Sequence, residues 1–160
     1  MPALRRPRTT RKQQLEMTLR PTPYAKLACL ALLPLAACAS NVVDARMQSI
    51  VETLASEHQD VTRLTVHTKP DAATRMMAIA STSPAKRGKV SDPEDQRAVD
   101  SGEIVVLEEK GGIDVTVPMR HKSGVFYAAA GVTFKSSIGR DAAIKRGRAI
   151  AATLERALAH

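Results

Sequence analysis

Three strand-like segments in close succession are the feature that most restricts how this chain can fold. They cover residues 103–109, 113–119 and 125–134. The connections between them are short, because Gly111 and Gly112 favour a hairpin turn and residues 121–124 favour a second turn. Consecutive strands with such short links pair antiparallel, so this region predicts a three-stranded antiparallel meander.

The last of these strands has two unlike faces. One face carries Phe126, Ala128, Ala130, Val132 and Phe134, and the other carries Tyr127, Ala129, Gly131 and Thr133. Small residues leave room for a close neighbour. We therefore expect a helix or a ligand to pack against this second face.

Helices are predicted on both sides of the strands. Asn41 is a suitable N-cap for a helix over about 42–57. Its apolar stripe is Val43, Met47, Ile50 and Leu54, and the polar residues Arg46, Gln48, Glu52 and Ser56 lie off that stripe. A second long helix begins at Ser137 or Gly139 and runs to about Ala159. Its core stripe is Ala143, Gly147, Ile150, Leu154 and Leu158.

Two more strands and a short helix complete the pattern. Residues 61–68 place Leu64 and Val66 on one face and Arg63, Thr65 and His67 on the other, and residues 75–81 form the second strand of a hairpin. Asp92 as N-cap and Pro93 after it begin a short helix that ends near Gly102. The element order predicts an α+β fold, with an antiparallel sheet of about five strands flanked by N- and C-terminal helices.

Residues 35–38, Leu-Ala-Ala-Cys, resemble the lipobox of bacterial lipoproteins, in which the Cys is lipidated and becomes the first mature residue. The apolar run before it is too short to span a bilayer and suits a signal peptide. The resemblance implies a signal peptide over 17–37, a lipidated Cys38 with a short tether over 38–41, and one domain over 42–160. It also implies an anchor in the outer membrane of a Gram-negative cell, facing the periplasm or exterior. The alternative is that Cys38 is a small buried residue of an Ala-rich helix.

Residues 1–16 are strongly basic and do not fit a normal export signal. We interpret them as an upstream extension from a mis-assigned start, with Met17 as the initiator; a basic nucleic-acid-binding arm is the alternative. Seven of the 24 basic residues and one of the 16 acidic residues precede Cys38, which leaves 17 and 15 and a net charge of +2. A domain so close to neutral is not expected to bind nucleic acid.

The element order and three local segments resemble the extracytoplasmic PAS-like sensor family, the Cache-type domains, over about residues 42–159. The segments are Ile79-Ala80-Ser81 with the loop through Arg87-Gly88-Lys89, the helix start at 91–95, and Val117-Pro118-Met119 followed by Ser123-Gly124 and the small-residue strand. The resemblance implies a domain that binds a small metabolite between its sheet and the loop and helix that cover it. It places Arg75, Ser81, Arg87, Lys89 and Tyr127 near the ligand, and their cations suit an anion. An ordinary solvated loop is the alternative for Arg87 and Lys89.

Other chemistry is less well supported. Asp92, Glu94 and Asp95 could be ligand or metal groups, but helix capping accounts for them. The four histidines have no zinc-ligand spacing, and no nucleophile or carboxylate pair stands in a recognisable catalytic arrangement. We expect no catalytic residue, no metal and no cofactor. The sequence therefore predicts a lipid-anchored envelope protein that binds a small anionic metabolite. The alternative is a structural or accessory lipoprotein that docks on another envelope protein.

Overall fold

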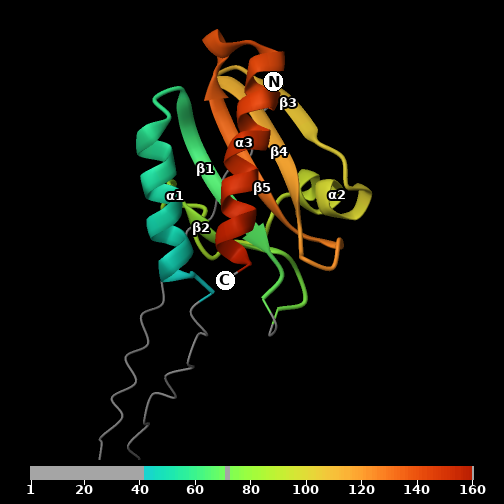
Figure 1. Ribbon diagram of the computed structural model, residues 1–160. Coiled ribbons are helices and arrows are strands. Elements are labelled where there is room, and N and C mark those ends of the chain that lie inside the picture. Colours follow the sequence, from blue (N-terminus) through green and yellow to red (C-terminus); the bar gives the residue numbers. More distant parts are fainter. Residues whose placement is uncertain (1–41, 71–72, 160) are drawn as a thin grey trace, which may run out of the picture. The chain divides into compact units, whose positions relative to one another are not determined.

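A five-stranded antiparallel sheet forms the centre of the domain (Figure 1). The protein is described by a computed structural model that covers residues 42–70 and 73–159. The elements are α1 (Ala45–Glu57), β1 (Val61–Thr68), β2 (Met77–Ser81), α2 (Pro93–Ser101), β3 (Val105–Glu109), β4 (Gly112–Arg120), β5 (Phe126–Lys135), the 3-10 turn η1 (Ser136–Ile138) and α3 (Arg140–Leu158). The predicted signal peptide, Cys38 and residues 1–16 lie outside the described residues.

The strands lie in the order β2-β1-β5-β4-β3, and every neighbouring pair is antiparallel. The predicted β1–β2 hairpin and the β3–β4–β5 meander are both present, and they are joined through the β1–β5 pairing. The predicted α+β class is thus confirmed. The β1–β5 pairing matters most for function because it brings residues near 65 and near 131 side by side: Thr65 pairs with Gly131.

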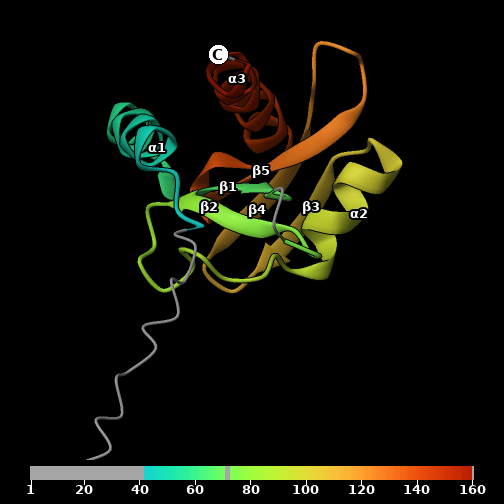
Figure 2. The ribbon, with the colours of Figure 1, turned by 90° about the horizontal axis from the view of Figure 1, so that it is seen from below.

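Helices cover both faces of the sheet (Figure 2). Helices α1 and α3 lie on one face, and α2 lies on the other. The apolar core fills the space between the sheet and α1 and α3; its largest fully buried side chains include Phe134, Met47, Leu64, Met119, Ile150 and Leu154. Full burial of one such side chain stabilises the fold by about 1.5–3 kcal/mol. In the described part of the chain, no helix is both long and apolar enough to cross a bilayer.

Helix α1 begins later than the sequence predicts. Its N-cap is Asp44, whose carboxylate accepts a hydrogen bond from the backbone N–H of Met47 at 2.9 Å. The predicted N-cap, Asn41, lies outside the described residues. Asp44 also donates its backbone N–H to the carbonyl of Ile79 at 2.9 Å, which ties the start of α1 to strand β2. The start of α1 is thus held by a tertiary contact with β2, and local helix propensity alone does not predict this start.

The predicted position of Gln48 is also wrong. The sequence predicts that it lies off the apolar stripe of α1, yet it is buried. Its side-chain N–H donates to the carbonyl of Ser81 at 2.9 Å, and its side-chain oxygen accepts from the N–H of Ser81 at 2.9 Å. Strand β2 lies at the edge of the sheet, where backbone groups lack a strand partner. The Gln48 amide supplies that partner, which is why a polar side chain is buried here.

The short helix α2 follows the sequence prediction closely. It begins after Asp92 with Pro93 as its first residue, and it ends at Gly102, whose φ of 71° is the left-handed conformation that favours glycine. Helix α2 packs on β5 and β4, on the face that carries Ala129 and Gly131. The predicted close packing against this small-residue face is confirmed.

Candidate functional site

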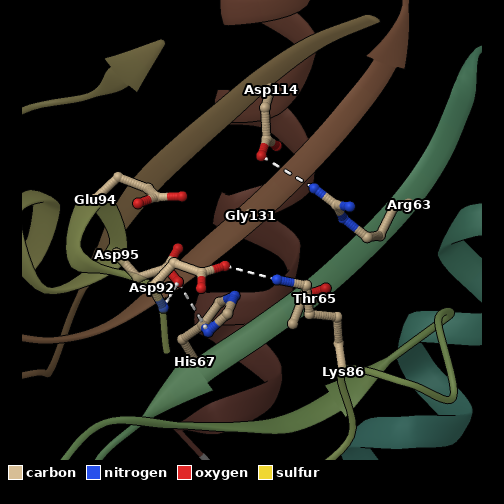
Figure 3. Close-up of a pocket in the computed structure, with 9 residues that line it drawn as sticks. All are labelled: Arg63, Thr65, His67, Lys86, Asp92, Glu94, Asp95, Asp114 and Gly131. Carbon is tan, nitrogen blue, oxygen red and sulfur yellow. Dashed lines mark hydrogen bonds and ion pairs between the residues drawn. The ribbon is translucent and has the colours of Figure 1, made fainter. Parts of the chain in front are cut away.

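A small polar pocket lies on the sheet face that α2 covers (Figure 3). Strand β1 supplies Arg63, Thr65 and His67, the loop over residues 82–92 supplies Lys86 and Asp92, α2 supplies Glu94 and Asp95, and β4 and β5 supply Asp114 and Gly131. The β1 residues are those that the sequence assigns to the face opposite Leu64 and Val66. Because side chains alternate along a strand, a core on one face leaves these three on the other.

Gly131 forms the floor of this pocket. A Cβ atom at this position would lie 3.4 Å from His67 Nε2 and 3.9 Å from Asp95 Oδ1. The missing side chain therefore leaves room for a small group that touches both of these polar atoms. The space at this floor that a water-sized group can occupy has a volume of about 20 Å³, which is enough for about one such group.

His67 and Asp95 form a buried pair beside this floor. His67 Nδ1 lies 3.3 Å from Asp95 Oδ2 and 2.8 Å from the hydroxyl of Ser91. Asp95 Oδ2 also accepts the backbone N–H of Asp92 at 3.0 Å. Ser91 and Asp95 thus contact the same ring nitrogen, so these three residues do not form a nucleophile relay, which needs its partners on opposite ring nitrogens.

Burial opposes charge on both members of the pair. Burial raises the pKa of Asp95 to about 7; the hydrogen bond from the backbone of Asp92 acts against this rise, and the nearby carboxylates of Glu94, Asp92 and Asp114 add to it. Burial lowers the pKa of His67 to about 4, which Asp92 counteracts and the cations Lys86 and Arg63 reinforce. His67 is therefore neutral near pH 7.

The remaining charges around the pocket are mostly paired. Arg63 lies 3.2 Å from Asp114, and Lys86 lies 2.6 Å from Asp92. The Lys86 and Asp92 side chains are 38% and 48% exposed, so this ion pair marks the solvent side of the pocket. Glu94 has no ion-pair partner within the described residues, and its carboxylate lies beside the pocket (Figure 3).

The five residues that the sequence predicts around a ligand do not converge on this pocket. Ser81 is fully buried, and its hydroxyl is 2.8 Å from that of Thr65. Arg87 is close to it and donates through Nε to the carbonyl of Ser81 at 2.8 Å, while its guanidinium pairs with Glu52 of α1 at 3.1 Å. These two predicted residues are brought together, but on the side of the loop that contacts α1.

The other three predicted residues lie apart from these two. Arg75 is exposed just before β2 and lines a separate surface hollow with residues that include Val90 and Pro93. Lys89 is exposed on the loop. Tyr127 is half-buried and meets the ring of His121 edge-on, with 5.7 Å between ring centroids.

The acidic residues at the start of α2 have the helix-capping positions that the sequence predicts, and they also contribute to the pocket. Asp92 is the N-cap and forms a capping box with Asp95, whose carboxylate accepts the backbone N–H of Asp92, and Glu94 lies in the first turn. The carboxylate of Asp92 also pairs with Lys86, and the side chains of Glu94 and Asp95 line the pocket. Within residues 42–70 and 73–159, no three His, Cys, Asp or Glu side chains are grouped so that they could hold a metal ion.

Sequence reasoning did not assign His67, Asp95 and Gly131 to one site. Two signals were present. His67 lies on the strand face opposite the core, and Gly131 belongs to a small-residue face that predicts a close neighbour. What the sequence lacked was the β1–β5 pairing that places the two faces side by side, with His67 paired to Ala129.

The fold is similar to that of GAF-like domains. The GAF domain of an Acinetobacter phosphoenolpyruvate-protein phosphotransferase matches with a TM-score of 0.54 and 18% identity, over 71% of this chain and 80% of that chain. A type II free methionine-R-sulfoxide reductase from Thermoplasma acidophilum matches with a TM-score of 0.52 and 14% identity, over 71% and 87%. The structure of fRMsr of Staphylococcus aureus in complex with its substrate matches with a TM-score of 0.50 and 11% identity, over 70% of this chain and 84% of that chain.

Neither a family model nor a curated protein sequence matches the chain. At such low identities the structural matches show the fold alone. The domain therefore has a GAF-like fold with the five-stranded sheet and flanking helices that the sequence predicts. The Cache-type family suggested by the sequence stays a prediction.

Proposed function

We propose that this domain is a small-molecule-binding module whose ligand enters the pocket between the sheet and α2. The observation that carries the proposal is a pair of polar atoms on buried side chains, His67 Nε2 and Asp95 Oδ1, that face the open floor at Gly131. The two side chains are only 7% and 6% exposed, yet neither atom has a hydrogen-bond partner within the described residues, and both open onto the pocket. A ligand group in this space would pair both.

Two further points support this choice. The similar solved structures include fRMsr of Staphylococcus aureus in complex with its substrate, so at least one protein of this fold binds a substrate. The pocket is also partly covered by a single exposed ion pair, Lys86–Asp92. Exposed pairs contribute about 1 kcal/mol or less, so displacing this one to admit a ligand costs little.

The docking alternative has less support. A protein-docking surface is expected to show a contiguous apolar patch. The large apolar side chains that are well exposed in the described part of the chain are Val90 and Val125, which lie on different loops. Single exposed apolar residues of this kind are ordinary.

Ligand binding is tested by thermal unfolding of the purified protein in the presence of amines, amino acids and organic acids. A ligand at one hundred times its dissociation constant stabilises the folded state by about 2.7 kcal/mol, which corresponds to a shift of several degrees. Gly131→Ala adds a methyl group to the pocket floor and should abolish the shift. Gly111→Ala is the matched control, since a Cβ there meets no atom within 4 Å. A flat screen on a cooperatively folded protein, or a shift that persists in Gly131→Ala, contradicts the proposal.

Anchoring at the cell envelope through Cys38 is the second part of the proposal. It is supported by the Leu-Ala-Ala-Cys sequence and the apolar run before it. An acyl chain contributes about 0.8 kcal/mol per buried methylene, so two chains anchor a protein stably. Expression of the full chain with a labelled fatty acid should label the wild type and leave Cys38→Ser unlabelled and no longer membrane-associated. Equal labelling of both would refute lipidation at this residue.

A further inference from the structure

The protonation of His67 determines what its free nitrogen can do. Asp95 Oδ2 accepts a backbone N–H from Asp92 and lies 3.3 Å from His67 Nδ1. Once Asp95 is ionised, above its pKa of about 7, two bare acceptors facing each other at this distance would repel, so the ring proton is then on Nδ1 and is shared between Asp95 and Ser91. Because burial lowers the pKa of His67 to about 4, the ring is neutral near pH 7. Nε2 is then an unprotonated acceptor that faces the pocket floor.

The other atoms around the floor are also acceptors. Asp95 Oδ1 faces the space above Gly131 and is an acceptor once Asp95 is ionised, above its pKa of about 7. Figure 3 shows the carboxylate of Glu94 beside the same space, and Glu94 has no cation paired with it among the described residues. The pocket thus offers an imidazole nitrogen and two carboxylates to a ligand, while its two cations, Arg63 and Lys86, are already held by Asp114 and Asp92.

The size of the space further restricts which chemical groups of a ligand can fit. A volume of about 20 Å³ holds a group no larger than about one water molecule. An ammonium group is of this size and has three donors and no acceptor. A carboxylate or phosphate group is larger and would be repelled by Asp95 and Glu94, whereas a guanidinium is too broad for the space.

We propose that the ligand of this pocket carries a primary ammonium group, which sits on Gly131 and donates hydrogen bonds to His67 Nε2, Asp95 Oδ1 and Glu94. This inference rests on the proposed function, because it names the chemical class of the ligand in the same pocket. The rest of the ligand extends outward past the Lys86–Asp92 pair. The anionic ligand predicted from the sequence depended on Arg75, Arg87 and Lys89, none of which lines this pocket.

The experiment compares n-butylamine, n-butanol and tetramethylammonium by calorimetric titration and thermal unfolding of the purified protein. These probes separate a primary ammonium from a neutral isostere and from a cation without donors. We expect saturable binding of n-butylamine and none of the other two. Glu94→Gln should weaken that binding about tenfold, because it removes a charge-assisted hydrogen bond. Asp100→Asn, on the same helix but outside the pocket, should leave it unchanged.

The outcomes distinguish the two proposals. Equal binding of butylamine and butanol, or an unchanged affinity in Glu94→Gln, overturns the ammonium inference. If an organic acid instead binds and Gly131→Ala abolishes its binding, the pocket function stands and the ligand class is wrong. If Gly131→Ala changes the binding of no ligand that the wild type binds, both proposals fail.

Discussion

His67 Nδ1 lies 3.3 Å from Asp95 Oδ2, and their side chains are only 7% and 6% exposed. The two groups respond to burial in opposite ways. The pKa of Asp95 is raised from 3.8 to about 7, and that of His67 is lowered from 6.5 to about 4. Between about pH 4 and 6.5, the folded pair therefore holds one proton on Asp95, and the unfolded pair holds one proton on His67. The number of protons bound by the pair is the same in both states.

This equality predicts how stability depends on pH. The unfolding free energy changes with pH in proportion to the difference in protons bound by the unfolded and folded states. Because that difference is near zero for this pair, the pair adds almost no pH dependence between about pH 4 and 6.5. Asp95→Asn leaves only the His67 contribution. The unfolded state then binds the extra proton, so stability should fall by about 1–3 kcal/mol as the pH is lowered through this range. Urea unfolding at four pH values measures this change.

The complementary variant should show the opposite slope. His67→Asn leaves only Asp95, which binds its proton more tightly in the folded state, so its contribution is lost as the pH rises from about 3.8 to 7. The exposed Asp100→Asn controls for a general loss of one carboxylate from α2. Parallel pH profiles for wild type and both pocket variants would contradict the opposed shifts.

Removing the two hydrogen bonds between the Gln48 amide and Ser81 should destabilise the fold. Gln48→Met keeps the length of the side chain but leaves the N–H of Ser81, which is buried, without its partner. An unsatisfied buried donor costs about 1–3 kcal/mol. Gln96→Met on the exposed side of α2 should change the free energy of unfolding by no more than about 0.5 kcal/mol. Chemical denaturation of both variants makes the comparison, and similar values for the two would refute the bridging role.

Two glycines with similar backbone angles should differ in their tolerance of alanine. Gly102 and Gly124 have φ values of 71° and 87°. A Cβ at Gly102 would collide with the ring of Phe126, whereas at Gly124 it meets nothing within 4 Å. Left-handed backbone costs an alanine about 1–2 kcal/mol. Gly124→Ala should lose about that amount, and Gly102→Ala should lose clearly more because the ring must also move. Equal losses would show that Phe126 relaxes without cost.

The variant Arg87→Ala tests whether the ligand binds at the residues predicted from the sequence. Its pair with Glu52 is partly exposed, with side-chain exposures of 32% and 55%, so Arg87→Ala should lower the free energy of unfolding by about 1 kcal/mol or less. Because Arg87 does not line the pocket, the variant should bind a pocket ligand as well as the wild type does. Loss of binding in this variant would move the ligand to the side of the loop that faces α1.

The sequence alone determined the elements and much of their order in space. The alternation in β4 and β5, the Asp92-Pro93 start and Gly102 end of α2, and the stripe of α3 are local patterns, and short connections force neighbouring strands to pair. The small-residue face of β5 even indicated that something packs closely there. Local periodicity carries this information because it follows directly from backbone geometry.

Only the tertiary structure decided the site. His67, Asp95 and Gly131 come from β1, α2 and β5, and they meet because β1 pairs with β5 while α2 crosses the same face. The burial of Gln48 and the start of α1 at Asp44 depend in the same way on contacts with β2. The resemblance to PAS-like sensor domains pointed to Arg87 and Lys89 instead, because a sequence shows which residues are polar but not which of them the fold removes from water. Burial is what changes the pKa of His67 and Asp95, and burial is a property of the assembled sheet and helix.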